Sequence, residues 1–204
     1  MPTRLQFKFT APNRDNFKCA IQCRRCAAVK PNGQQCRART CMGVPYCWQH
    51  GQSEYKVRIK PSGIPGAGKG LFAASRAAAP GAVVFRRDDF IAPYGGEVIT
   101  DAQLTDRYGN YTAPYGMQVF GQRYENGACV RGPGSMANQA ATRGAANAKL
   151  AHGRRTVDGV VQYYARVVAI KPIRNGQEIL VWYGARYVFD EPGVSYQTKR
   201  ARGV

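Results

Sequence analysis

Short apolar runs, several of them alternating with polar residues, recur along the chain between turn residues. The runs that predict strands lie at 55–59, 71–73, 82–85, 116–120, 157–170 and 179–182. Within 157–170, Asp158-Gly159 is a pair typical of a hairpin turn. A short helix is predicted from Asp101, because Thr100 and Gln103 have the spacing of a capping box. The pattern therefore predicts a mainly β (α+β) chain.

The run at 179–182 belongs to a distinctive stretch, residues 176–187. Gly176 ends a basic turn, the apolar run follows, and Tyr183 comes directly before Gly184. We expect a strand that ends on a tyrosine, next to a glycine that allows another backbone segment to come close. Taken by itself, the stretch is equally compatible with a sheet edge that carries an aromatic plug.

The charge of the chain is strongly positive and unevenly distributed. Its 204 residues leave room for one ordinary domain and a small module, and the formal net charge is +18, from 30 Lys+Arg and 12 Asp+Glu. Residues 1–53 contain nine basic residues and one acid, Asp15. Such an excess indicates an acidic partner, usually nucleic acid or a protein bound to it, although a basic face can also serve solubility alone.

The expected location of the protein bears on the state of its cysteines. No apolar run approaches the roughly 20 residues of a membrane-spanning helix, and the N-terminus lacks the apolar core of a signal peptide. We therefore expect an intracellular protein with no membrane partner. In a reducing compartment, seven cysteines favour metal binding, and disulfides are the less favoured alternative.

Six of the seven cysteines fall between positions 19 and 47, and His50 comes soon after them. A zinc site needs about four nitrogen or sulfur ligands in a tetrahedron. The spacing predicts that the zinc ligands are Cys26, Cys36, Cys47 and His50. This spacing resembles a short Cys-Cys-Cys-His zinc module that often ends in Tyr-Cys-Trp-x-His. Three cysteines are left over as buried thiols, part of a second site or alternative ligands: Cys19, Cys23 and Cys41.

A glycine-rich loop occupies residues 63–70. Its spacing comes close to a phosphate-binding P-loop, but Gly70 stands where a serine or threonine must hold magnesium. A dinucleotide-binding fingerprint fails as well, because no glycine stands at the third required position. The remaining interpretation is a backbone loop that can approach a ligand closely and then enters a strand.

Four motifs in chain order resemble those of the SET-domain protein lysine methyltransferases. They are the glycine-rich 66–73, the Tyr-Gly-Gly-Glu motif at 94–99, the asparagine region at 136–150, and 178–187, which is most similar to the PR-type branch. The resemblance covers roughly residues 54–190. It implies a SET-like fold of small β-sheets with a pseudoknot. It also implies transfer of a methyl group from S-adenosylmethionine to a lysine side chain, with a histone as the default substrate.

The resemblance also assigns roles to individual residues. Tyr183 falls at the catalytic tyrosine, which orients the amine, and Tyr94 falls in the lysine channel. The family normally has histidine after the first asparagine, whereas this chain has Gln139, whose amide can still bond an adenine or ribose edge. The implied cofactor-binding residues are Lys69, Gly70, Asn138, Gln139 and Asn147.

These observations divide the chain into four parts. They are an N-terminal arm at 1–18, a zinc module at 19–53, a SET-like domain at 54–190 and a basic tail at 191–204, with 51–54 as the linker. The resemblance and the charge together imply a chromatin protein of the nucleus. The rival interpretation is a non-catalytic SET-like or PR-like module that binds chromatin or nucleic acid through its basic N-terminal part.

Overall fold

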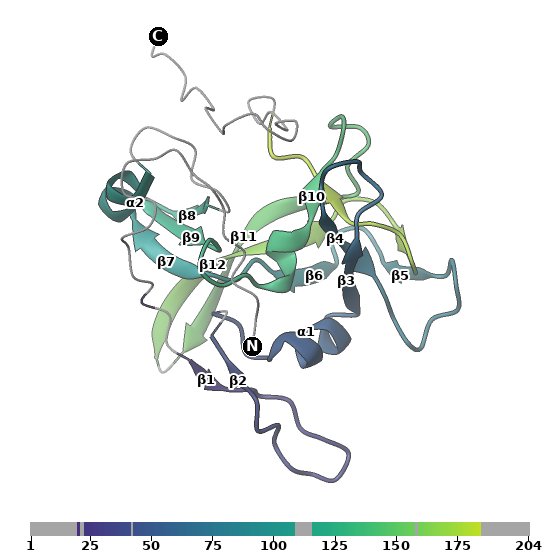
Figure 1. Cartoon of the computed structure of the whole chain (residues 1–204), viewed down its shortest axis with the longest axis horizontal. Helices are drawn as coiled ribbons and strands as arrows, with labels where there is room; N and C mark the ends of the chain where they lie inside the picture. The colour runs from purple at the N-terminus through teal and green to yellow at the C-terminus, as the bar shows by residue number, and fades with distance from the viewer. Residues whose placement is uncertain (1–19, 21–22, 42, 109–115, 158, 185–204) are drawn as a thin grey trace.

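The computed structural model describes residues 20, 23–41, 43–108, 116–157 and 159–184. The predicted arm at 1–18, the tail at 191–204 and Cys19 lie outside the described residues. Figure 1 shows small twisted sheets packed around a common centre, with a narrow two-stranded ribbon extending from them. The mainly β class predicted from the apolar pattern is confirmed.

The largest sheet has five strands and carries the centre of the fold. Its order is β10 (Asn138–Gln139), β14 (Leu180–Val181), β11 (Ala148–Val157), β12 (Val160–Ala169) and β6 (Phe90–Pro93). β11 and β12 form a long antiparallel hairpin in which Val157 pairs with Val160 and Gly159 lies in the left-handed region; Asp158 of the predicted turn lies outside the described residues. At its middle, a Cβ on Gly153 would lie 2.6 Å from the Tyr164 ring, so the hairpin needs glycine there.

Among the described residues, four smaller sheets accompany this one. A three-stranded sheet has the order β7 (Glu97–Thr100), β9 (Arg123–Asn126), β8 (Gly116–Phe120). The two-stranded sheets pair β1 (Arg24–Arg25) with β2 (Arg39–Thr40), β3 (Val57–Pro61) with β4 (Lys69–Ala73), and β13 (Ile173–Arg174) with β5 (Val83–Phe85). The predicted runs at 55–59, 71–73, 82–85 and 116–120 correspond to β3, β4, β5 and β8.

In the described part of the chain, three short helices connect the sheets: α1 (Trp48–Glu54), α2 (Asp101–Tyr108) and the 3-10 helix η1 (Pro133–Met136). The predicted capping box is present, since Thr100 Oγ1 accepts from the Gln103 N–H at 3.2 Å and Gln103 Oε1 accepts from the Thr100 N–H at 2.9 Å. The prediction of a linker at 51–54 is wrong, because these residues complete α1. None of the helices in the described part of the chain is long and apolar enough to cross a membrane.

The main core joins strands from three of the sheets. Buried apolar side chains along the chain from Val57 to Val181 form one cluster, which includes Leu71, Ile91 and Ile179. Burying a side chain of this size stabilises the fold by about 1.5–3 kcal/mol. All the predicted apolar runs except 116–120 therefore contribute to this centre.

Strand β14 has an unusual place in the sheet. It lies between β10 and β11, parallel to both, although about 30 to 40 residues separate it from them in the chain. The last described segment thus passes between two strands that precede it, which is the crossed connection expected from the predicted pseudoknot. This arrangement brings Tyr183 beside residues 137–139.

Candidate functional site

The predicted metal ligands are brought together at the base of the N-terminal module. The donor atoms of Cys26, Cys36, Cys47 and His50 all lie within 4.8 Å of one another, and the three cysteines are buried. His50 Nδ1 is 3.6 Å from Cys26 Sγ and 3.3 Å from Cys47 Sγ. Around a tetrahedral zinc ion, neighbouring sulfur and nitrogen donors are about 3.5 Å apart. The four donors could therefore hold a metal ion with little rearrangement.

Backbone N–H groups around the cluster stabilise thiolates. The Cys47 N–H donates to Cys26 Sγ at 3.2 Å, and the Ala38 N–H donates to Cys36 Sγ at 3.4 Å. Burial raises the pKa of Cys26, but hydrogen bonds from Cys47 and Ala28 outweigh it and leave the pKa below its usual value. For Cys47, burial and the neighbouring Cys26 raise the pKa. The Cys26 thiol is thus more acidic than a free cysteine, and a bound cation would favour loss of the proton from the other thiols.

Two of the leftover cysteines, Cys23 and Cys41, are paired with each other, contrary to the expectation that metal binding would account for the cysteines. Cys23 and Cys41 form a disulfide at the base of the ribbon that carries Cys26 and Cys36, and Cys129 is also disulfide-bonded. The spacing could not show this, because β1 and β2 bring positions 23 and 41 together by pairing Arg24 with Thr40. The module is therefore closed both by a disulfide and by the Cys/His cluster.

Tyr183 is fixed at two points of the crossed segment. Its backbone N–H donates to Gln139 Oε1 at 2.7 Å, and its hydroxyl donates to the carbonyl of Ala137. The ring is partly buried against the main core. Gln139, which departs from the family's histidine, thus holds the backbone of the tyrosine that the motif placed at the catalytic position.

Tyr94 belongs to an adjacent cluster. It is buried with Val119 and Ala165, and Tyr163 packs against this group. Leu150 packs against both this cluster and the main core that Tyr183 contacts. The backbone of Tyr94 also lies against the loop that enters η1, where a Cβ on Gly132 would overlap the Tyr94 carbonyl oxygen. The same segment, 132–137, therefore contacts both predicted site tyrosines.

Glu178, which is not among the predicted site residues, connects the glycine loop to the asparagine region. Its carboxylate accepts from Ser62 Oγ at 2.7 Å, from the Gly63 N–H at 3.0 Å and from Asn138 Nδ2 at 3.1 Å. A Cβ on Gly70 would overlap Glu178 Oε1 and lie 2.9 Å from its Cδ. The sequence offered one signal for this residue. Glu178 is a carboxylate directly before an apolar run that predicts a buried strand, and a buried acid needs hydrogen-bond partners.

Asn138 and Asn147 form different hydrogen bonds. Asn138 donates through Nδ2 to the Lys69 carbonyl at 3.2 Å as well as to Glu178. The Asn147 side chain donates to the Glu178 carbonyl at 2.8 Å and accepts from the Leu180 N–H at 2.8 Å. Asn147 therefore clamps the start of β14, whereas Asn138 lies where Lys69 and Gly70 leave the glycine loop.

A buried carboxyl lies behind Tyr94. Glu125 accepts from the Ala165 N–H at 2.6 Å, and the carbonyl of Ala165 accepts from the Tyr94 N–H at 2.8 Å. Burial raises the pKa of Glu125 to about 7, although the backbone hydrogen bond from Ala165 and the charge of Arg155 oppose the shift. Glu125 therefore titrates near neutral pH next to a predicted channel residue.

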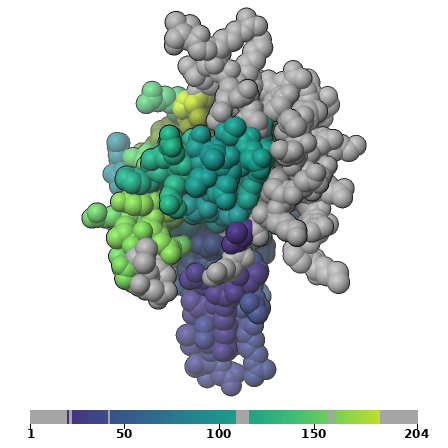
Figure 2. All heavy atoms as spheres, turned by 90° about the vertical axis from the view of Figure 1, so that its left-hand side faces the viewer, coloured from purple at the N-terminus to yellow at the C-terminus, as the bar shows by residue number. Residues whose placement is uncertain are grey.

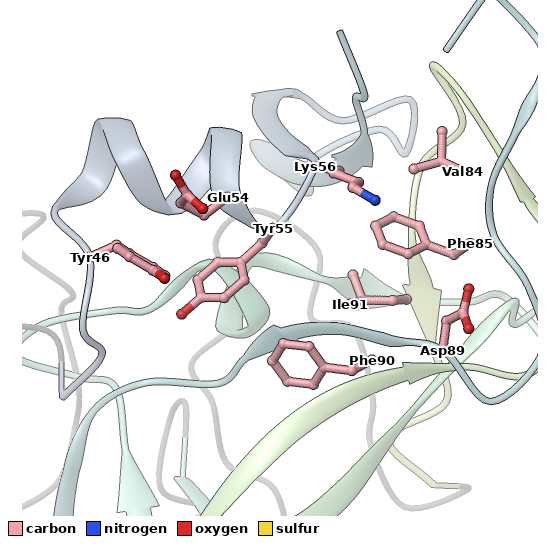
Figure 3. Close-up of a pocket in the computed structure, with 9 residues that line it drawn as sticks. All are labelled: Tyr46, Glu54, Tyr55, Lys56, Val84, Phe85, Asp89, Phe90 and Ile91. Atoms are coloured by element: carbon pink, nitrogen blue, oxygen red, sulfur yellow. The ribbon is translucent and has the colours of Figure 1, made fainter. Parts of the chain in front are cut away.

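An open hollow of about 410 Å³ lies elsewhere, where α1 meets β6 (Figure 3). Tyr46, Tyr55 and Phe90 line it, and the ring of Tyr55 makes edge contacts with the other two at centroid distances of 5.6 and 5.9 Å. Burial raises the pKa of Tyr55. None of the predicted cofactor residues lines this hollow, which instead marks the junction between the N-terminal module and the larger domain.

Comparisons with known proteins give only structural matches. No family model and no curated protein matches the chain. Polycomb repressive complex 2 of Chaetomium thermophilum, in an autoinhibited conformation bound to S-adenosylmethionine, matches at 21% identity and a TM-score of 0.47, over 63% of this chain and 15% of that one. A crystal structure of the same complex matches at 21% identity and a TM-score of 0.46, over 64% and 15%.

An apo form of that complex with substitutions in Ezh2 matches with a TM-score of 0.43. This chain thus spans about 15% of the length of the matched chains. Similarities of this extent carry no argument about activity. A function for this chain has to be argued from its own contacts, above all the crossed β14 and the two tyrosines held by one segment.

Proposed function

We propose that the chain is a protein-lysine N-methyltransferase that uses S-adenosylmethionine. The observation that supports this best is the crossed β14, which holds Tyr183 against residues 137–139 while the preceding segment contacts Tyr94. Methyl transfer from a sulfonium to an amine is a direct displacement, which needs alignment and a dry channel more than strong acid or base groups. Two partly or fully buried tyrosines on a rigid support fit that need.

The polar groups at the glycine loop fit S-adenosylmethionine. No hydrogen bond within the described chain uses Asn138 Oδ1 or Gln139 Nε2, so one acceptor and one donor are available to a ligand. The adenine and amino-acid parts of the cofactor carry complementary groups. Lys69 and Gly70 would contribute backbone groups, and Asn147 would act through the strand that it clamps. When bound, the cofactor supplies an electrophilic methyl group.

The role of Tyr183 depends on its hydrogen bonds. Because its hydroxyl already donates to Ala137, its oxygen can accept from an N–H of a substrate amine and so direct the nitrogen lone pair. A free lysine has a pKa near 10.4, and a buried channel favours its neutral form. Tyr183 therefore orients the amine. The channel walls, including Tyr94, lower the free energy needed for the substrate lysine to enter in its neutral form.

The substrate that we propose is a lysine in a histone tail, in chromatin of the nucleus. The formal net charge of +18 supports a location near nucleic acid. The rival function is a non-catalytic SET-like binding module, which the replacement of the family's histidine by Gln139 favours. The hydrogen bond from Tyr183 to Gln139 favours catalysis instead, because it keeps the tyrosine in place.

We also propose that the Cys/His cluster binds zinc as a structural site. Three cysteines and one histidine supply all four ligands, so no position is open for a substrate or a catalytic water. The module 19–53 is too small to fold on an apolar core alone. The ion would therefore stabilise the module rather than take part in the chemistry.

The test separates cofactor binding from transfer. S-adenosylmethionine is titrated by calorimetry into the zinc-replete wild type and the Tyr183→Phe variant, and transfer of labelled methyl to histone-tail peptides is measured for both. We expect similar cofactor affinities and a loss of transfer of about 100-fold or more in the variant. Tyr46→Phe, in the distant hollow, is the matched control. No cofactor binding by the wild type would contradict the proposal and favour the binding module.

A further inference from the structure

The N-terminal module projects a basic ribbon, defined here as residues 24–40. Backbone hydrogen bonds join its two strands from Cys26 to Cys36, and a tight turn at its tip runs from Lys30 to Gln34, with Gly33 in the left-handed region. Figure 1 shows the ribbon extending away from the other sheets, and Figure 2 shows it as part of a narrow lobe at the lower end of the molecule.

All the charges of this ribbon have one sign. Its basic side chains are all exposed, and the sequence from 23 to 53 contains no acid. No carboxylate of the described residues forms an ion pair with any of them. The five residues are Arg24, Arg25, Lys30, Arg37 and Arg39.

Several links join the two halves of the ribbon. Cys26 and Cys36, from its two opposite halves, belong to the Cys/His cluster, and the Cys23–Cys41 disulfide closes its base. Arg25 also bridges the strands, through hydrogen bonds to the carbonyls of Gln35 and Cys36 at 2.9 and 3.0 Å. A ligand that binds here therefore does not have to order the loop first, which lowers the entropic cost of association.

We propose that the basic ribbon binds duplex DNA by seating in a groove and contacting phosphates on both sides. The major groove of B-form DNA admits a two-stranded β-ribbon, whereas the major groove of A-form RNA is too narrow for one. Seven residues of extended backbone, the length of 24–30, span about 20 Å and can follow several phosphates. This DNA contact does not depend on the proposed methyltransferase activity, because it uses a different surface and needs no cofactor.

The test is fluorescence anisotropy of a labelled duplex of about 20 base pairs with the full zinc-replete chain, repeated across salt concentrations. The test variant is Arg24→Gln/Lys30→Gln/Arg37→Gln, and it should bind at least about tenfold more weakly at about 0.1 M salt. The slope of log affinity against log salt should become shallower by about 3, since each lost phosphate contact removes about 0.9.

The matched control removes the same charge from exposed positions of the larger domain, as Arg58→Gln/Arg76→Gln/Arg86→Gln. We expect this control to keep most of its affinity, and zinc content and thermal melting show that both variants are folded. Equal losses in the two triple variants would overturn the proposal in favour of diffuse charge attraction. Equal affinity of the wild type for duplex RNA or for a glutamate-rich peptide would also overturn it.

Discussion

Replacing Gly70 with alanine should destabilise the junction between the glycine loop and β14. The new Cβ would overlap Glu178 Oε1 and lie 3.0 Å from Asn138 Nδ2, so the Glu178 carboxylate would have to move. Glu178 would then lose hydrogen bonds from Ser62, Gly63 and Asn138. At about 1 kcal/mol each for a partly exposed group, the free energy of unfolding should fall by about 2–3 kcal/mol.

This loss should lower the melting temperature by about 5–10 °C. Thermal and urea denaturation would be measured for Gly70→Ala, Glu178→Ala and the double variant. Because Glu178→Ala removes both the clash and the same hydrogen bonds, the second substitution should add less than about 1 kcal/mol. A matched control is Gly144→Ala, where the nearest atom to a new Cβ is 3.9 Å away. Additive losses in the double variant, or a Gly70→Ala protein as stable as the wild type, would refute the reasoning.

Three further predictions concern other parts of the molecule. Removing the metal with a chelator, or substituting Cys47→Ala, should unfold the N-terminal module. Zinc content and circular dichroism measure this unfolding, and a module that keeps its structure without zinc would contradict the prediction. Reduction of Cys23–Cys41, 18 residues apart, should destabilise the module by about 3 kcal/mol in urea unfolding, and an unchanged midpoint would count against it. Because burial raises the pKa of Glu125 from 4.5 to about 7, its folded form keeps a proton that the unfolded chain releases. This contribution to stability is full below about pH 4.5 and is lost as pH rises through about 7, which lowers the free energy of unfolding by about 3 kcal/mol. Urea unfolding across this pH range should show the loss in the wild type and a flatter dependence in Glu125→Gln. A flat wild-type profile would contradict this role of Glu125.

Local patterns predicted the parts of the fold that depend on neighbouring residues. The apolar runs predicted β3, β4, β5 and β8, and the Thr100-Gln103 spacing predicted the start of α2. The hairpin of β11 and β12 was also predicted, because residues typical of a tight turn stand between its two strands in the sequence. Missed elements include β6, whose sequence Phe-Ile-Ala-Pro has no alternation and is defined by its pairing with β12.

Contacts between distant residues were harder to predict. The cysteine spacing selected the four residues whose donors meet, because a turn and a short helix bring them together within one small module. The disulfide was not predicted, since it depends on the register of β1 and β2. The partners of Glu178 are 40 to 116 residues away in the chain, and no periodicity reports on such pairs. Whether the predicted catalytic and cofactor residues act as proposed stays a prediction.

The insertion of β14 between β10 and β11 has a consequence for synthesis of the chain. Residues emerge from the ribosome in order, so the central sheet keeps a gap until residues 180–181 are available. Contacts over such long separations form slowly, because closing a long loop costs entropy before any contact compensates. The segment that completes the sheet also carries Tyr183, so a chain that stops early lacks both a closed core and the residue proposed to orient the amine.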